Sequence, residues 1–112
     1  MSVLENAKAH YKAKLSAEPH PISIPEWELE AFIKPGISLE RLGEIMQCAN
    51  ENKTAEAMVL TVVYRLIDDE GKPIFRKADR LELLKSVDPS VLAEIVNKIN
   101  ESDPSVEDVE GN

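Results

Sequence analysis

The residues most capable of chemistry lie in an acidic segment, Asp68-Asp69-Glu70-Gly71, whose carboxylates suggest a calcium site. An EF-hand loop needs oxygen ligands at alternating positions, glycine at position six and glutamate at position twelve. Counted from Asp68, glycine falls at position four and Asp79 at position twelve. Because this spacing does not match, we interpret the segment as a solvated turn in which Gly71 adopts a positive φ.

The other reactive side chains do not form a catalytic or metal-binding set. Glu26 and Glu28 are spaced as an acid pair, but no glycine-rich cleft, histidine base or oxyanion donor accompanies them. His10 and His20 have no Cys or His at ligand spacing. Cys48 is the only cysteine, so no internal disulfide forms, and we interpret it as a half-buried small hydrophobic residue. We therefore expect no enzymatic activity, no metal and no cofactor.

The charge balance also narrows the classes of partner. The 112 residues carry a formal net charge of −8, with 21 acidic residues against 13 basic ones. Nucleic acids and anionic membranes attract clustered Lys and Arg, and the sequence has no such cluster. No apolar run approaches the ~20 residues that span a bilayer, and the N-terminus lacks the apolar core of a signal peptide. We expect a soluble protein of a reducing cytoplasm with a basic or apolar protein partner.

The first third of the chain predicts a helix followed by a β-hairpin. Ser2 begins a capping box, and a thin apolar stripe continues to Leu15. Three prolines then end the helix. Apolar and polar residues alternate over residues 22–34, which predicts a short strand, a turn near Pro25 and a longer strand beginning at Trp27. Because a lone hairpin is marginal in water, it must lie on helices or pair with another copy.

Apolar stripes at helical spacing predict four further helices. The segment from Thr54 to Ile67 is apolar over more than half its circumference, which places it at the centre of the fold, with a strand as the alternative. The Asp88-Pro89 pair predicts the start of the last helix. The expected apolar faces of the other three helices are Leu39, Leu42, Ile45, Met46 and Ala49; Ala78, Leu81, Leu84 and Val87; and Val91, Leu92, Ile95, Val96 and Ile99.

These elements predict an α+β, mainly α fold: a small helical domain with one β-hairpin. We expect residues 1–18 to form a loosely docked N-terminal helix and residues 19–101 to form the hairpin-plus-helices domain. Residues 102–112 are acidic, contain no basic residue and are expected to be a disordered tail.

The hairpin carries the candidate contact residues. Trp27 is the only tryptophan, and an indole at the hairpin turn either anchors the hairpin on the helices or contacts a partner. Leu29 and Ile33 follow it on the same face by strand periodicity. We therefore predict Trp27, Leu29 and Ile33 as the contact for a partner or for self-association.

The order of these elements resembles the tail assembly chaperones of long-tailed, siphovirus-type bacteriophages. The resemblance covers the region from Ile22 to Ile99. It rests on Trp27 in the hairpin, the Ile33-Lys34-Pro35 exit into a helix, the apolar helix ending near Ile67, the Asp69-Glu70-Gly71 turn, Phe75, and the Leu-rich and final helices.

The resemblance implies assembly rather than chemistry. Members of this family are understood to bind the tape measure protein, keep its apolar helices soluble, and leave as the tail tube polymerises. It implies a homo-oligomer in the cytoplasm of the host bacterium, with the tape measure protein and the tail tube protein as partners, and absence from the mature virion. Two other classes stay open: a small acidic adaptor or regulatory inhibitor of phage or bacterial origin, and a subunit whose active site lies on another chain.

Overall fold

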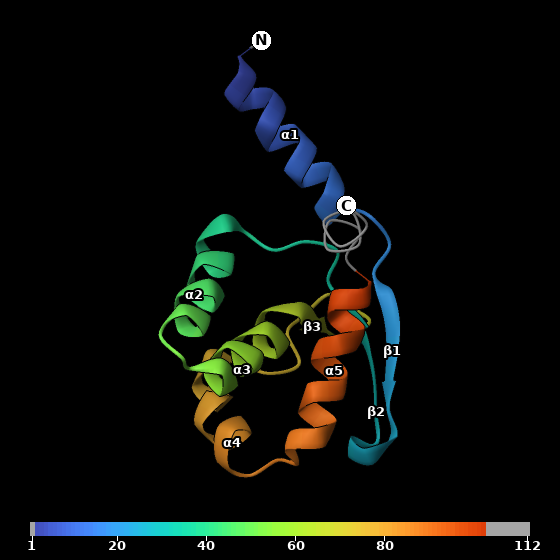
Figure 1. Ribbon diagram of the computed structural model, residues 1–112. Coiled ribbons are helices and arrows are strands. Elements are labelled where there is room, and N and C mark those ends of the chain that lie inside the picture. Colours follow the sequence, from blue (N-terminus) through green and yellow to red (C-terminus); the bar gives the residue numbers. More distant parts are fainter. Residues whose placement is uncertain (1, 103–112) are drawn as a thin grey trace.

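Figure 1 shows the computed structural model of the protein, which describes residues 2–102. The predicted tail beyond Ser102 lies outside the described residues. The described part contains five α-helices and a three-stranded antiparallel sheet of order β1-β2-β3. In chain order the elements are α1 (Val3–Leu15), β1 (His20–Ile24), η1 (Pro25–Trp27), β2 (Leu29–Ile33), α2 (Leu39–Asn50), α3 (Thr54–Arg65), β3 (Leu66–Ile67), η2 (Lys77–Asp79), α4 (Arg80–Lys85) and α5 (Pro89–Glu101). The predicted class, α+β and mainly α, is confirmed.

The predicted hairpin is confirmed, although its second strand begins later than expected. Ile22 pairs with Ala31 and Ile24 with Leu29, so apolar residues on the two strands share one face. Trp27 belongs to the 3₁₀ turn η1, because Glu28 adopts a left-handed conformation with φ of 52° and donates its N–H to the Pro25 carbonyl at 3.1 Å. This conformation interrupts the extended backbone, and β2 therefore starts at Leu29.

A third strand replaces the predicted end of the central helix. α3 is helical only to Arg65, and Leu66–Ile67 pairs with β2 through Ile33 and Phe32. The Lys34 N–H donates to the Arg65 carbonyl at 2.7 Å, and Arg65 Nε donates to the Lys34 carbonyl at 2.9 Å. The Arg65 carbonyl, which would accept a later N–H if α3 continued as a helix, is therefore bonded to the backbone that follows β2. As a consequence, Leu66 pairs with β2 as a strand residue.

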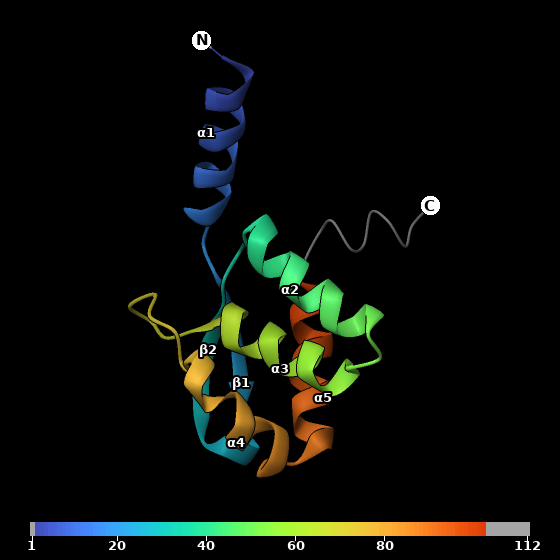
Figure 2. The ribbon, with the colours of Figure 1, turned by 90° about the vertical axis from the view of Figure 1, so that its left-hand side faces the viewer.

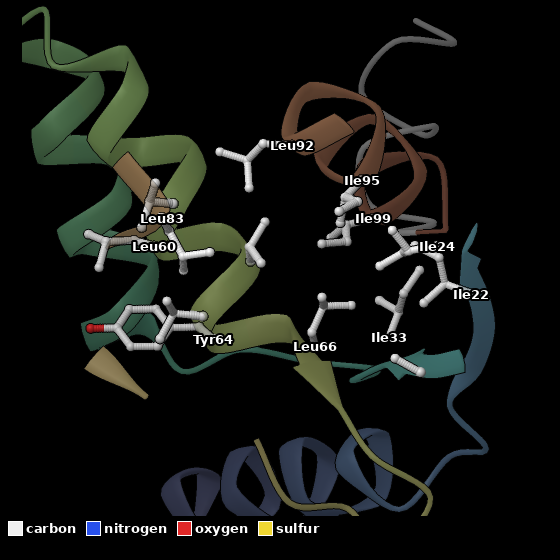
Figure 3. Close-up of a cluster of buried hydrophobic side chains, with 14 of the residues drawn as sticks. Ile22, Ile24, Ile33, Leu60, Tyr64, Leu66, Leu83, Leu92, Ile95 and Ile99 are labelled. Atoms are coloured by element: carbon white, nitrogen blue, oxygen red, sulfur yellow. The ribbon is translucent and has the colours of Figure 1, made fainter. Parts of the chain in front are cut away.

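The core lies where α3 and α5 meet the sheet. α3 is buried around most of its circumference, as predicted, with Val59 and Val62 almost inaccessible to solvent. Figure 3 shows Ile95 and Ile99 of α5 facing the hairpin residues Ile22, Ile24 and Ile33. The chain's own helices therefore cover the hairpin face, and the hairpin needs no second copy for its stability.

The predicted apolar face of the short fourth helix is confirmed at Leu84 and Val87, which are half-buried against the core, but not at Ala78 and Leu81. Leu83 is buried on α4, whereas the expected Leu81 is 57% exposed. The turn η2 sets this phase, because the Asp79 carboxylate accepts the Arg76 N–H at 2.8 Å and fixes where the helix begins. A six-residue helix completes fewer than two turns, so its sequence alone leaves its rotation undetermined.

The apolar stripe of α2 is mostly exposed, contrary to prediction. Ser38 caps the helix, accepting the Arg41 N–H at 3.3 Å. α2 then packs on α3 through half-buried side chains, among them Ile45 and Cys48. The rest of the stripe is largely exposed: Leu39 is 82% exposed and Met46 55%, while Leu42, which borders a cleft with Thr61 and Arg65, is 38% exposed.

The N-terminal helix α1 extends away from the body of the molecule (Figures 1 and 2). Ser2 caps it as predicted by accepting the Glu5 N–H at 3.1 Å, and none of its residues from Val3 to Leu15 is buried. Its last turn lies against the segment before α2, where a Cβ on Gly36 would meet Leu15 Cδ2 at 3.2 Å. α1 is therefore held at its base only.

The acidic segment is a turn, as predicted. Asp68 Oδ1 accepts the N–H groups of Glu70 and Lys72 at 2.8 and 2.9 Å, and Gly71 has a φ of 85°. The Asp68 carboxylate is thus used to close the turn on its own backbone.

Among the helices within residues 2–102, none has the length and apolar character needed to cross a lipid bilayer.

Candidate functional site

An apolar groove lies beside the hairpin turn. The hairpin turn and α4 lie at the end of the molecule opposite α1 (Figures 1 and 2). The volume of the groove is about 540 Å³. Four separate parts of the chain meet there: the hairpin turn, the loop after β3, α4, and the connection into α5. The lining residues are Trp27, Leu29, Ile74, Phe75, Leu83, Ser86, Val87 and Asp88.

Two aromatic rings form one wall of this groove. Trp27 and Phe75 are in edge-to-face contact, with ring centroids 5.9 Å apart and planes at 89°. Both rings are half-buried, so each packs against the core on one side and reaches the groove on the other. An edge-to-face aromatic pair of this kind presents a large, rigid apolar surface that loses little side-chain entropy on binding.

The backbone around the groove is fixed by local hydrogen bonds. Glu28 closes the turn that carries Trp27, and the Ile74 N–H donates to the Leu66 carbonyl at 3.2 Å, which places Phe75 beside the sheet. Asp88 stands at the rim, where its carboxylate accepts the Ser90 N–H at 2.9 Å and caps α5. The groove is therefore a preformed apolar surface with an acidic rim, which suits an apolar side chain flanked by a basic or polar one.

The three predicted contact residues do not share one accessible surface. Trp27 and Leu29 line the groove and remain half-buried. Ile33 is only 3% exposed, because it packs in the core opposite α5 and pairs with Leu66 of β3. Ile33 is thus removed from the candidate contact of the folded chain, while Trp27 and Leu29 stay in it.

A second, charged cluster lies where α2 meets α3. The Tyr64 hydroxyl donates to Glu44 Oε2, and Lys77 Nζ donates to Glu44 Oε1 at 3.1 Å. The Arg41 guanidinium stacks on the Tyr64 ring with Cζ 4.8 Å from its centroid. Three elements, α2, α3 and η2, are thus joined through one carboxylate, which fixes the half-buried α2 on the body.

The fold is similar to that of a solved structure whose role is known. That structure, of the bacteriophage HK97 tail assembly chaperone, superposes with a TM-score of 0.62 over 85% of this chain and 94% of the other, at 16% sequence identity. The chain shares the fold of that tail assembly chaperone. No protein-family model and no curated protein sequence matches it. The structural likeness therefore agrees with the family that the order of elements suggested.

The chaperone-like fold brings together residues that sequence reasoning did not assign to a site. Ile74, Leu83 and Val87 line the groove, and Phe75 had been noted only through the family resemblance. They come from segments that are far from the hairpin in sequence, and no local periodicity connects them. Glu44, Tyr64 and Lys77 also come from segments that no local periodicity connects. The sequence offers a single indication of this cluster, the Glu44 carboxylate on a partly apolar helix.

The charged cluster gives α2 a pH-dependent attachment. The Tyr64 hydroxyl, and then the Lys77 ammonium, hold the pKa of Glu44 below its usual range. Burial, and then the bond to Glu44, raise the pKa of Tyr64, and the bond to Glu44 raises the pKa of Lys77. At pH values above the usual glutamate pKa range, the lowered pKa of Glu44 stabilises the folded state. This stabilisation is lost as the pH falls through the pKa that Glu44 has in the folded protein. The raised pKa values of Tyr64 and Lys77 contribute stability that is lost only as pH rises through them.

We expect Glu44→Gln to lower the melting temperature at neutral pH and to do so less as the pH falls. At acid pH the parent loses the same interaction by protonating Glu44, so the two melting curves converge. Thermal melts across an acid pH series measure the difference, with Glu40→Gln, an exposed substitution on the same helix, as control. A difference between Glu44→Gln and parent that stays constant down the series would contradict this assignment.

Proposed function

We propose that this protein is a phage tail assembly chaperone that binds the tape measure protein and keeps it soluble before the tail tube polymerises. It acts without catalysis, in the cytoplasm of the host bacterium, and is absent from the mature virion. The tail tube protein is a further partner, and copies of the chaperone self-associate along the client.

The observation that carries this proposal is the fold shared with the HK97 tail assembly chaperone over 94% of that chain. The preformed groove at Trp27 and Phe75 supports it independently. A chaperone of this kind must hold apolar helices that have no other partner, and apolar grooves accept such helices through side chains at i, i+3 and i+4. The groove offers an apolar wall of this type on a chain with a net charge of −8, which keeps the complex in solution.

The physical role of the groove is reversible capture. Its rings are already packed against the core, so binding orders few side chains and does not require refolding. The groove is also small compared with a long client, so one copy covers only a short stretch of it. The release of one copy therefore requires little free energy. Many copies on one client therefore protect it together and still leave as the tube replaces them.

Co-expression with the cognate tape measure protein tests the proposal. The parent chain should move the client from the insoluble to the soluble fraction and co-purify with it. Trp27→Ala should weaken client binding by about 30-fold or more, since truncating a central aromatic contact commonly costs at least ~2 kcal/mol of binding free energy. Leu81→Ala is the matched control, because Leu81 is exposed and does not line the groove.

Client binding is compared only between variants that are shown to be folded. Circular dichroism and thermal melts establish that Trp27→Ala is folded at the assay temperature. If the client is equally insoluble with and without the parent chain, the chaperone role is wrong and the adaptor alternative replaces it. If Trp27→Ala is folded and retains the client as the parent does, the groove is not the client site.

A further inference from the structure

The large exposed apolar side chains of this protein gather on two helices. Of the six within residues 2–102, Val3 and Leu4 lie on α1, and Leu39, Leu42 and Met46 on α2; the sixth is Leu81 of α4. Leu39, at 82% exposed, and Val3, at 83%, have almost no contact with the rest of the chain. Contiguous apolar residues left in water on a folded chain indicate a protein contact.

The stripe on α1 begins on the body of the molecule and continues beyond it. At 100° per residue, Val3, Leu4, Ala7, Tyr11 and Leu15 fall within one face of the helix. Tyr11 and Leu15 lie against Gly36, whereas Val3 and Leu4 extend past the body with no covering surface. A 13-residue helix held only at its base is marginal in water, so its outer turns gain stability from a second surface.

The stripe on α2 has the shape that a second helix needs. Leu39 and Met46 lie on the side turned away from α3, and Gly43 follows Leu39 by one helical turn. Leu42 lies at the edge of this stripe, where it borders a cleft with Tyr11 and Thr61. A Cβ at Gly43 would meet nothing within 4 Å, so no contact within the described part of the chain requires glycine there. Glycine is less favourable than alanine inside a helix, and its position beside an open apolar stripe suits close approach by another helix.

Charge and length make α1 the fitting occupant. α1 carries three lysines and one glutamate, a net charge of +2, so the rest of a chain with net charge −8 carries −10. The charged residues of α2 are Glu40, Arg41 and Glu44, a net charge of −1. At 1.5 Å per residue, the part of α1 before Tyr11 is about 12 Å long, enough to cover the stretch of about 10 Å from Leu39 to Met46 on α2.

We propose that α1 of one copy packs on the α2 stripe of another copy, Val3 and Leu4 against Leu39, Leu42 and Met46. Each copy then donates α1 and accepts a neighbour's α1, a heterologous contact that either closes into a ring or continues as an open chain. This inference specifies the self-association within the proposed function. It leaves the groove at Trp27 free for a client, because the hairpin turn and α4, which line that groove, lie at the end of the molecule opposite α1 (Figure 2).

Two complementary variants test the contact. Val3→Gln/Leu4→Gln removes the donated surface, and Leu39→Gln/Met46→Gln removes the accepting surface. Glutamine keeps good helix propensity and leaves the charge unchanged. Sedimentation velocity of the full chain over a dilution series measures association. Each variant alone should need at least a tenfold higher concentration to associate, while Leu81→Gln, also at an exposed leucine, should behave as the parent.

Mixing the two variants gives the decisive result. The α2 variant still donates α1 and the α1 variant still accepts it, so an equimolar mixture should form dimers and no larger species. Higher salt should weaken both the parent assembly and this dimer, because the contact joins opposite charges. Circular dichroism of each variant confirms that the body and α1 remain helical.

The remaining outcomes overturn the proposal. A parent that stays monomeric at all concentrations, a variant that associates as the parent does, or a mixture that forms no dimer each shows that α1 does not bind α2 of another copy. Client solubilisation is measured in parallel with both variants. Loss of self-association with the client still bound to the groove would leave the chaperone role intact, so the two proposals fail separately.

Discussion

Truncation of Ile95 to alanine should destabilise the fold by about 2–5 kcal/mol. Ile95 lies in the middle of α5, is 2% exposed, and faces the hairpin residues Ile22 and Ile24 (Figure 3). Removing its side chain leaves a cavity between the helix and the sheet that the close-packed surroundings cannot fill. Leu92→Ala, one turn earlier on the same buried face, should cost a similar amount.

Thermal and denaturant melts measure these losses. A domain of this size has about 5–15 kcal/mol of stability, so either substitution removes a large part of it. Ile95→Val should cost only about 0.5–1.5 kcal/mol, because it deletes a single methylene. Glu94→Ala, at an exposed position on the same helix, serves as control. Melting temperatures for Ile95→Ala and Leu92→Ala equal to the parent's would contradict the placement of α5 in the core.

Leu66→Ala should also cost about 2–5 kcal/mol, for a reason the sequence did not provide. Leu66 is completely buried in β3, opposite Ile33 of β2, and its carbonyl accepts the Ile74 N–H at 3.2 Å. The side chain therefore fills the space between the sheet and the two central helices, while the backbone holds the loop that carries Phe75. Its loss opens a cavity at the point where three segments of the chain meet.

The strand position of Leu66 gives this substitution a second readout. Amide hydrogen exchange should accelerate at Ile74, whose bond to Leu66 depends on the packing of β3. Leu81→Ala is the control for stability, because Leu81 is 57% exposed and its truncation removes few contacts. A Leu66→Ala protein as stable as the control, with unchanged exchange at Ile74, would show that β3 is not part of the core.

The starts of α1, α2 and α5 and the central core were predictable because they depend on residues close in sequence. Ser2, Ser38 and Asp88 each accept a backbone N–H two or three residues ahead, and these bonds are available to any chain with that local order. The stripe of α5 has a single apolar face that the helix period defines, and Leu92, Ile95 and Ile99 are buried as expected.

The errors arose where one apolar pattern allows more than one packing. Leu66 and Ile67 continue the helical stripe of α3, but a hydrogen bond from Lys34, more than 30 positions earlier, draws them into the sheet. In α4 the spacing of Leu81, Leu83 and Leu84 does not determine which side of the helix is buried. The turn η2 sets the rotation of the helix, so that Leu83 is buried and Leu81 is exposed. The site was only partly predicted for the same reason: Trp27 was singled out as the one indole, while Leu83 and Val87 join it only through the fold.

The sequence by itself determined the class of this protein: a small, acidic, mainly helical domain with a hairpin, in an order of elements that resembles tail assembly chaperones. Short-range periodicity, capping and composition suffice for that, since each acts within a few residues along the chain. The tertiary structure alone decided which apolar residues are enclosed and which face water. Ile33 was enclosed by α5, whereas Leu39, Leu42 and Met46 were left outside, because the choice depends on which side of α2 meets α3. Periodicity marks a face as apolar, and only long-range packing determines whether the chain itself covers that face.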